Sequence, residues 1–204
     1  MKNGIMKSFI STKCKGFTLA AVAASAAFHG SSGLAKDPTP ALLHPHEGEQ
    51  LTRRWGYPAT IKADPVTTGA KQFSAGTEDI PPGKAIPRHR HTHFEELVIV
   101  QSGTLEAHVG DQRRTMGPGS IAFAPPNTWM GFENVGNTTA TIIWIFPTPG
   151  FEEYLRATSV PARSPVTPLT ADEIKVIREK HKDHIQLEQG DISAYPTDAK
   201  VQNK

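Results

Sequence analysis

The chain has 204 residues, with 22 lysines and arginines against 20 aspartates and glutamates, 37% hydrophobic residues and one cysteine. This length suits one domain with a substantial core, and the nearly balanced charge, without a dense basic stripe, excludes a nucleic-acid-binding footprint. A single cysteine excludes an intramolecular disulfide framework and a cysteine-based zinc cluster. With 17 glycines and 17 prolines, the composition indicates a turn-rich globular protein with no nucleic-acid partner.

Residues 1–35 have the composition of a secretory signal peptide. They contain four lysines and no acidic residue, an apolar run over 17–28, and small residues at Gly33 and Ala35. This pattern is typical of a leader cleaved before Lys36, and the run is too short for a permanent membrane span. We therefore expect a secreted or periplasmic protein with no membrane partner after cleavage; the alternative is an alanine-rich leader without a targeting role. Removing the four lysines leaves 18 basic against 20 acidic residues, a net charge of −2, and no cysteine.

The remaining chain divides into an arm, a β domain and a helical end. Residues 36–65 contain five prolines, which break long helices, and we interpret them as an extended N-terminal arm. Residues 66–160 alternate turn residues with short apolar or β-branched runs, of which 96–100, 120–124 and 138–146 are the clearest. Short strands at near-regular spacing without intervening helices predict an all-β sandwich or small barrel.

Short helices are expected toward the C-terminal end. One is predicted at 151–155, and a clearer one over 171–182 within a final segment, 161–204, that ends in a polar tail. Thr170 and Glu173 have the spacing of a capping box, in which each side chain bonds the other residue's backbone N–H. The second helix therefore has a defined start.

The densest group of ligand-type side chains lies within residues 87–96. Alternate residues of a strand share a face, so His89, His91 and His93 are candidates to point the same way. Two imidazoles and a following carboxylate such as Glu96 can form a site that binds a metal on one side and leaves coordination positions open. The spacing alone leaves a second interpretation, a solvated polar strand or an accidental histidine-rich tract.

The intervals around this group resemble the first motif of the cupin superfamily. That motif runs glycine, five residues, His-x-His, four residues, glutamate, six residues, glycine. It is matched at every interval by Gly83, His89, His91, Glu96 and Gly103. The resemblance is to single-domain, quercetinase-like secreted bacterial members.

The second cupin motif is matched with two departures. Gly119, Pro125 and Asn134 stand at the expected intervals. Asn127 stands where glycine is usual, and Met130 stands where the family has its fourth metal-binding histidine. The departure at Met130 puts the strength of the metal site in doubt.

The resemblance covers about residues 66–160, and 147–154 are similar to the strand-to-helix exit of quercetinase-like bacterial cupins. It implies a double-stranded β-helix, the cupin or jelly-roll barrel, with a metal inside near one mouth and with short C-terminal helices. It also implies a homodimer that acts on a small-molecule substrate.

The resemblance implies that His89, His91 and Glu96 bind a divalent transition metal, which would be Fe, Ni, Zn, Mn or Cu. Met130 is either a fourth, thioether ligand, which suits soft ions, or an apolar plug in the vacated histidine position. Glu96 or His93 is the candidate for taking a proton from the substrate.

Two aromatic residues, Trp129 and Phe123, are candidates for the wall of the substrate pocket. The favoured activity, by resemblance, is oxygenation of a phenolic or enol-type substrate, in which the metal activates a substrate oxygen. A competing hypothesis is a non-catalytic cupin that binds a small ligand or a sugar, its metal site degraded by Met130. A cupin lyase or isomerase and a periplasmic copper-handling protein are also compatible with the resemblance.

Overall fold

The computed structural model describes residues 36–188, so the predictions of a signal peptide over 1–35 and of a polar tail after 188 lie outside the described residues. The described part of the chain contains strands and two helices, all short. In chain order they are β1 (Glu49–Arg53), β2 (Pro58–Ala63), β3 (Ser74–Ile80), β4 (Ala85–Arg90), β5 (Glu96–Ser102), β6 (Leu105–Val109), β7 (Gln112–Met116), β8 (Ile121–Ala124), β9 (Met130–Asn134), β10 (Ala140–Phe146), α1 (Phe151–Ala157), β11 (Ser159–Pro161), α2 (Ala171–Lys180) and β12 (Gln186–Leu187).

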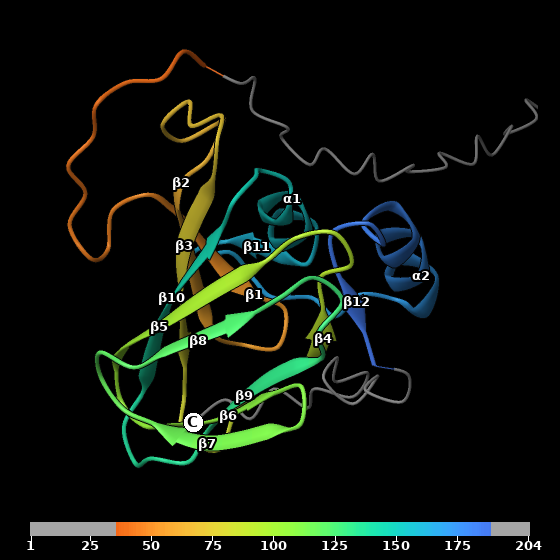
Figure 1. The fold of residues 1–204 in the computed structure, drawn as a ribbon. Helices are drawn as coiled ribbons and strands as arrows, with labels where there is room; N and C mark the ends of the chain where they lie inside the picture. Colours follow the sequence, from red (N-terminus) through yellow and green to blue (C-terminus); the bar gives the residue numbers. More distant parts are fainter. Residues whose placement is uncertain (1–35, 189–204) are drawn as a thin grey trace, which may run out of the picture.

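The strands form two antiparallel sheets that face each other (Figure 1). The larger sheet has the order β11-β1-β2-β3-β10-β5-β8, and the smaller has the order β12-β4-β9-β6-β7. Strands adjacent in the chain repeatedly lie in different sheets, as β4 and β5 do, so the chain winds back and forth between the two layers. The all-β prediction, a double-stranded β-helix with short C-terminal helices, is confirmed.

The core lies between the sheets, where the inward-facing side chains of the strands pack together. In β5 the inward residues Val98 and Val100 are buried, and they pack with Ile142 of β10 in one apolar cluster. The smaller sheet contributes Leu105 and Phe132 to the same cluster. Burial of these side chains from both sheets stabilises the layered arrangement.

The sheet begins earlier in the chain than the predicted boundary at residue 66. Strands β1 and β2 lie inside the segment interpreted as an arm, and they pair with each other and with β11 and β3. The prolines did not prevent this, because Pro58 is the first residue of β2, where a missing N–H is tolerated. Within the predicted arm, residues 36–48 precede the first strand and contain no strand themselves.

The C-terminal part of the described chain returns to the barrel. The capping box at the start of α2 is confirmed: Thr170 Oγ1 accepts from Glu173 N, and Glu173 Oε2 accepts from Thr170 N. After α2, strand β12 pairs with β4, with Leu187 opposite His89 (Figure 1). None of the helices in the described residues is long and apolar enough to cross a membrane.

Candidate metal centre

Two histidines reach the barrel interior from the end of β4. Pro87 has no N–H to donate, and the pairing of β4 with β9 shifts its register between Ile86 and His89. After this irregularity His89 is buried, Arg90 is half-buried, and His91, the first residue after the strand, is buried again. The period-two alternation therefore turns both imidazoles inward, as the spacing predicted.

Glu96 reaches the same place from the first position of β5. It alternates with Val98 and Val100 on the inward face of that strand, so its carboxylate is buried. Glu95 is exposed, as expected for a neighbour on the opposite face. The interval from Glu96 to Gly103 thus identified the inward carboxylate correctly.

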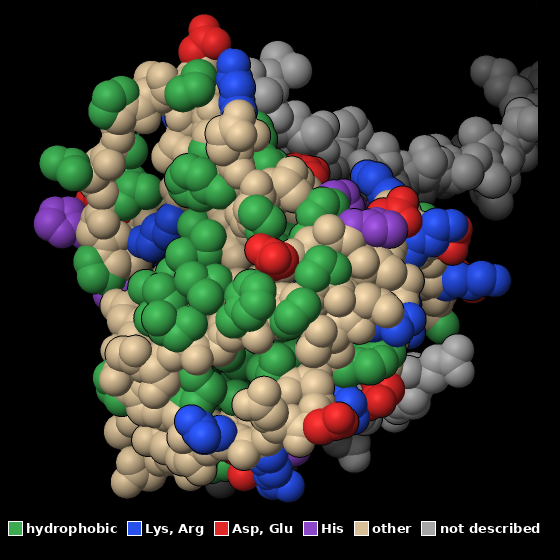
Figure 2. Space-filling view, viewed as in Figure 1, with side chains coloured by type: hydrophobic (Ala, Val, Ile, Leu, Met, Phe, Trp, Pro, Cys, Tyr) green, Lys and Arg blue, Asp and Glu red, His purple; other side chains and the backbone are tan. Residues whose placement is uncertain are grey.

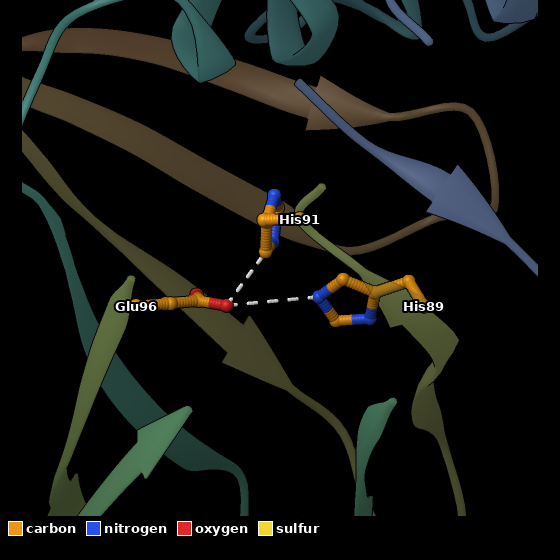
Figure 3. A group of neighbouring side chains, drawn as sticks. All are labelled: His89, His91 and Glu96. Carbon is orange, nitrogen blue, oxygen red and sulfur yellow. Dashed lines mark ion pairs between the residues drawn. The ribbon is translucent and has the colours of Figure 1, made fainter. Parts of the chain in front are cut away.

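The three side chains converge on one point (Figure 3). Glu96 Oε2 lies 3.2 Å from His91 Nε2 and 3.7 Å from His89 Nε2. One potential ligand atom from each residue lies within 4.8 Å of the other two. A zinc ion about 2.1 Å from each atom in tetrahedral geometry needs ligand atoms roughly 3.4 Å apart, so these separations fit a shared ion.

Backbone carbonyls set which nitrogen of each imidazole faces the cluster. His89 Nδ1 lies 2.7 Å from Pro87 O, and His91 Nδ1 is hydrogen-bonded to His184 O. A carbonyl oxygen can only accept, so each Nδ1 carries a proton and donates it. In the neutral imidazoles each Nε2 therefore presents its lone pair to the cluster, which is the form that binds metals.

The cluster requires positive charge at its centre. His91 Nε2 and Glu96 Oε2 are buried and have no hydrogen-bond partner within the described residues. Burial alone would raise the pKa of Glu96, but the adjacent imidazoles of His89 and His91 lower it to about 2. Either a second proton on an imidazole or a cation can supply the positive charge. Two nitrogen donors and one carboxylate fit a divalent transition metal, which would compete with protons for this site.

Aromatic side chains hold His91 in place. Its ring centroid lies 4.7 Å from that of Phe146 at the end of β10 and 5.4 Å from that of Phe151 at the start of α1. The backbone N–H of Asn127 donates to His91 O over 2.6 Å. Asn127 has φ of 62°, in the left-handed region where asparagine is tolerated, which explains how it stands in a glycine position of the motif.

A narrow cavity opens beside His89 and Glu96, and the space between atoms there, open solvent included, amounts to about 490 Å³. Its wall is mainly apolar and aromatic, with a few buried polar residues. The lining residues are Arg53, Trp55, Glu78, Ile86, Pro87, His89, Glu96, Phe132, Ile142, Trp144, Phe151, Tyr154, Ile185 and Leu187. Such a cavity next to three convergent ligand atoms is the form of a small-molecule site.

Two charged residues in this wall, Arg53 and Glu78, were not predicted as site residues. Both are buried, and their nearest charged atoms, Nη1 and Oε1, lie 3.7 Å apart. If residues 49–53 had been predicted as a strand, the alternation of faces along it would have put Arg53 on the same inward face as Leu51. On the inward face of β3, Glu78 follows Ser74 and Gly76, which are not large apolar residues. An alternation of apolar and polar residues therefore does not identify this face from the sequence.

Met130 lies directly opposite His89 in the pairing of β4 with β9. Its side chain is 2% exposed and packs in the apolar cluster between the sheets, and it is not among the residues that line the cavity. Its position next to a candidate ligand agrees with the motif, and its apolar surroundings are those expected of a plug.

Three other predicted site residues do not reach the cavity. The prediction of Phe123 in the pocket wall is wrong: it is 51% exposed, because Ile121 and Phe123 face outward on β8 while Ala122 and Ala124 face inward. Trp129 is half-buried, and its ring contacts the Arg90 guanidinium at 4.7 Å instead of lining the cavity. His93, predicted as a proton acceptor, is exposed after β4 has ended.

The remaining motif positions support the turns and strand ends. Gly103 has φ of 78°, and a Cβ there would lie 2.5 Å from Ala140 Cα, so a larger residue would clash. Asn134 Nδ2 donates to Ile80 O and Thr138 O, and its Oδ1 accepts from Gly136 N. These contacts tie the end of β9 to the end of β3 and to the turn before β10.

The buried Glu78 predicts a pH-dependent stability for the metal-free chain. Burial raises the pKa of Glu78, although the charges of Arg53 and His89 oppose this. The folded chain thus holds this proton more tightly than the unfolded chain, a contribution that is complete below the unfolded pKa of about 4.5 and is lost as the pH rises through the folded pKa. Relative to Glu78→Gln, the wild type should lose up to about 1.4 kcal/mol of unfolding free energy per pH unit in that window.

Urea unfolding from pH 4.5 to 8 in the presence of a chelator measures this difference. Glu133→Gln, on the exposed face of β9, is the control. A wild type that gains stability over Glu78→Gln as the pH rises would contradict the expected sign.

Residues 76–146 match the family model of the cupin domain. The matched segment runs from within β3 to the end of β10 and contains all three candidate metal ligands. The prediction of a cupin domain is thus confirmed. None of the curated proteins matches the chain.

The chain is similar in structure to several solved proteins. KdgF from Halomonas sp. shares 19% identity at a TM-score of 0.49, over 56% of this chain and 99% of that one. A predicted oxalate decarboxylase from Thermotoga maritima shares 15% identity at a TM-score of 0.48, over 53% and 100%. An RmlC-like cupin from Shewanella frigidimarina shares 16% identity at a TM-score of 0.48, over 58% and 99%.

Proposed function

We propose, with the cupin domain at residues 76–146 as the premise, that this chain is a metal-dependent enzyme that acts on a small molecule in the cavity beside His89 and Glu96. One observation carries the proposal: three buried donor atoms from His89, His91 and Glu96 converge, and two of them lack any hydrogen-bond partner within residues 36–188. Buried polar atoms are costly without a partner, so this arrangement favours an ion between them.

The favoured reaction is oxygenation of a phenolic or enol-type substrate, as in quercetinase-like cupins. A divalent metal, when bound, supplies Lewis-acid activation of a substrate oxygen. The wall residues Trp144, Phe151 and Tyr154 give the cavity an aromatic lining that suits a planar apolar body.

Glu78 is a better candidate than Glu96 or His93 for accepting the substrate proton. Glu96, with a pKa of about 2, holds protons weakly, and His93 lies outside the cavity wall. Glu78 lines the cavity, and burial raises its pKa. A carboxylate with a raised pKa is the stronger base, so we assign the proton-accepting role to Glu78.

A non-catalytic small-ligand or sugar-binding cupin is the second candidate, and Met130 favours it. The family position of the fourth ligand is filled here by a side chain packed in an apolar cluster. Three ligands hold a metal more weakly than four, so the site could have lost its metal. A cupin lyase or isomerase uses the same three ligands and differs from the favoured enzyme in consuming no dioxygen.

Metal analysis of the purified chain, made without a metal-binding tag, tests the proposal. We expect close to one divalent metal per chain after reconstitution and dialysis. Metal at about 100 times its dissociation constant should stabilise the fold by about 2.7 kcal/mol, which raises the melting temperature by roughly 5–10 °C. Substoichiometric metal after reconstitution with each candidate ion would overturn the metal-dependent enzyme and leave the binding protein. Dioxygen uptake with small phenols then separates oxygenases from the other enzyme classes.

We also propose that the protein is exported, on the composition of residues 1–35. Expression of the full chain in a bacterium with an outer membrane should yield periplasmic protein whose first residue is Lys36. An uncleaved N-terminus on cytoplasmic protein would contradict export.

A homodimer is proposed from the face over β5 and β8, where hydrophobic side chains gather (Figure 2). Ile121 and Phe123 on the edge strand β8 are 61% and 51% exposed. A second copy of the chain placed on this face would cover both, and exposed apolar patches commonly mark such interfaces. Phe123→Lys should therefore convert a dimer to a monomer in sedimentation analysis, whereas Val176→Lys, on the exposed face of α2, should not. An unchanged dimer in Phe123→Lys would exclude this face.

A further inference from the structure

A buried arginine lies in the cavity wall without the partners that its burial requires. Arg53 is 4% exposed, and its Nε and Nη1 have no hydrogen-bond acceptor within the described residues. Its guanidinium carbon lies 4.0 Å from the centroid of the Trp55 ring, a stacking contact that gives Nε and Nη1 no hydrogen-bond acceptor. Removing a guanidinium from water is costly unless its donors are bonded.

Glu78 does not supply the missing acceptors. The closest charged atoms of the two residues are 3.7 Å apart, beyond hydrogen-bond distance, and Glu78 Oε2 is itself without a partner within the described residues. The other carboxylate of the cavity wall, Glu96, faces His89 and His91. Arg53 is also the only lysine or arginine among the described residues that line the cavity.

A second buried donor lies in the same wall. Trp144 is 1% exposed, and its indole Nε1 has no acceptor within residues 36–188. The wall therefore contains a fixed positive charge and several N–H donors. It lies beside His89 and Glu96, two of the candidate metal ligands. This is the chemistry that recognises an oxyanion, and the planar fork of an arginine matches a carboxylate in particular.

We propose that Arg53 anchors the carboxylate of the substrate, so that this enzyme acts on a small carboxylic acid with an apolar or aromatic body. The inference rests on the proposed function, since the metal site at His89, His91 and Glu96 is where the rest of that molecule reacts. Arg53 comes from β1, outside the matched cupin segment, so this anchor is a feature of the chain's own N-terminal strands. The apolar lining then selects among acids by shape.

Calorimetric titration with benzoate and benzamide tests the anchor, because the two probes have the same shape and differ in charge. The purified chain is titrated in a chelator-treated form and in a zinc-loaded, dialysed form. We expect the wild type to prefer benzoate, and Arg53→Met to weaken benzoate binding by about 10- to 100-fold while leaving benzamide binding unchanged. Arg114→Met, on an exposed position of β7, is the matched control and should keep the preference. Equal affinities of the wild type for both probes, or an undiminished preference in Arg53→Met, would overturn the proposal.

A second variant keeps the test valid if Arg53→Met does not fold. Glu78→Gln leaves the guanidinium in place and removes the negative charge 3.7 Å from it. Benzoate should then bind at least as tightly as to the wild type, and weaker binding would overturn the anchor. The two metal states separate the anchor from the proposed function: a chain that takes up no zinc but prefers benzoate refutes only the metal site, whereas a zinc-loaded chain without that preference refutes only the anchor.

Discussion

His91→Ala should lower the affinity of the chain for Zn²⁺ by at least about 100-fold. Loss of a residue that only orients a ligand already costs about 10- to 100-fold in metal affinity, and His91 is itself a candidate ligand. Its Nε2 lies 3.2 Å from Glu96 Oε2 and has no other polar partner within residues 36–188, so its removal leaves two donors from His89 and Glu96. Competition against a chromogenic zinc chelator measures the affinity directly.

His181→Ala is the matched control for this variant. His181 is also a buried histidine, 4% exposed, and it lies outside the group of candidate ligands. Both variants lose a buried ring and should be destabilised in the metal-free form, but only His91→Ala should lose zinc. If the two variants bind zinc equally well, the three-residue site is not where the metal binds.

Met130→His should tighten zinc binding by about 10- to 1000-fold, because it restores a fourth ligand where the family has one. Residues 89 and 130 are directly paired across β4 and β9, and directly paired residues of antiparallel strands project to the same side with Cβ atoms about 5 Å apart. A fourth neutral nitrogen donor completes the tetrahedral set that zinc prefers. The cost is a polar ring in an apolar cluster, which should destabilise the metal-free chain by about 1–3 kcal/mol.

Met116→His separates the gain of a ligand from the effect of a buried imidazole. Met116 is the other methionine of the apolar cluster and is 7% exposed at the end of β7. The Met116→His chain should be destabilised in the metal-free form as the Met130→His chain is, and its affinity for zinc should not rise. A folded Met130→His chain with wild-type affinity would mean that the side chain at position 130 does not reach the donor set.

The candidate metal ligands could be predicted from the sequence because they lie within a few residues of one another in the chain. His89 and His91 share a face through the strand period, and Glu96 follows a few residues later at the start of the next strand. Of the two adjacent glutamates, only Glu96 stands at the six-residue interval from Gly103 that the family motif requires, and its neighbour Glu95 is exposed. The runs over 96–100, 120–124 and 138–146 contain strands for a similar reason, since each of them is rich in β-branched or apolar residues.

The residues that surround the candidate ligands could not be predicted in this way. Arg53 and Glu78 meet only because β1, β2 and β3 are neighbours in one sheet, a pairing that proline-rich composition concealed. Phe123 was assigned to the pocket by residue type, but the register of β8 against β5 turns it outward, since Phe123 pairs with Leu97 and not with Glu96. A shift of one residue in that register would have exchanged the two faces of the strand.

The acceptor that orients His91 lies 93 positions further along the chain, at His184. During synthesis, the candidate ligands are all present once residue 96 has been added, yet His91 gains this partner only after nearly the whole described chain has followed. The hydrogen bond that orients His91 therefore requires the segment after α2 to return to β4. A chain that ends before residue 184 has every candidate ligand but lacks the contact that fixes the proton on His91.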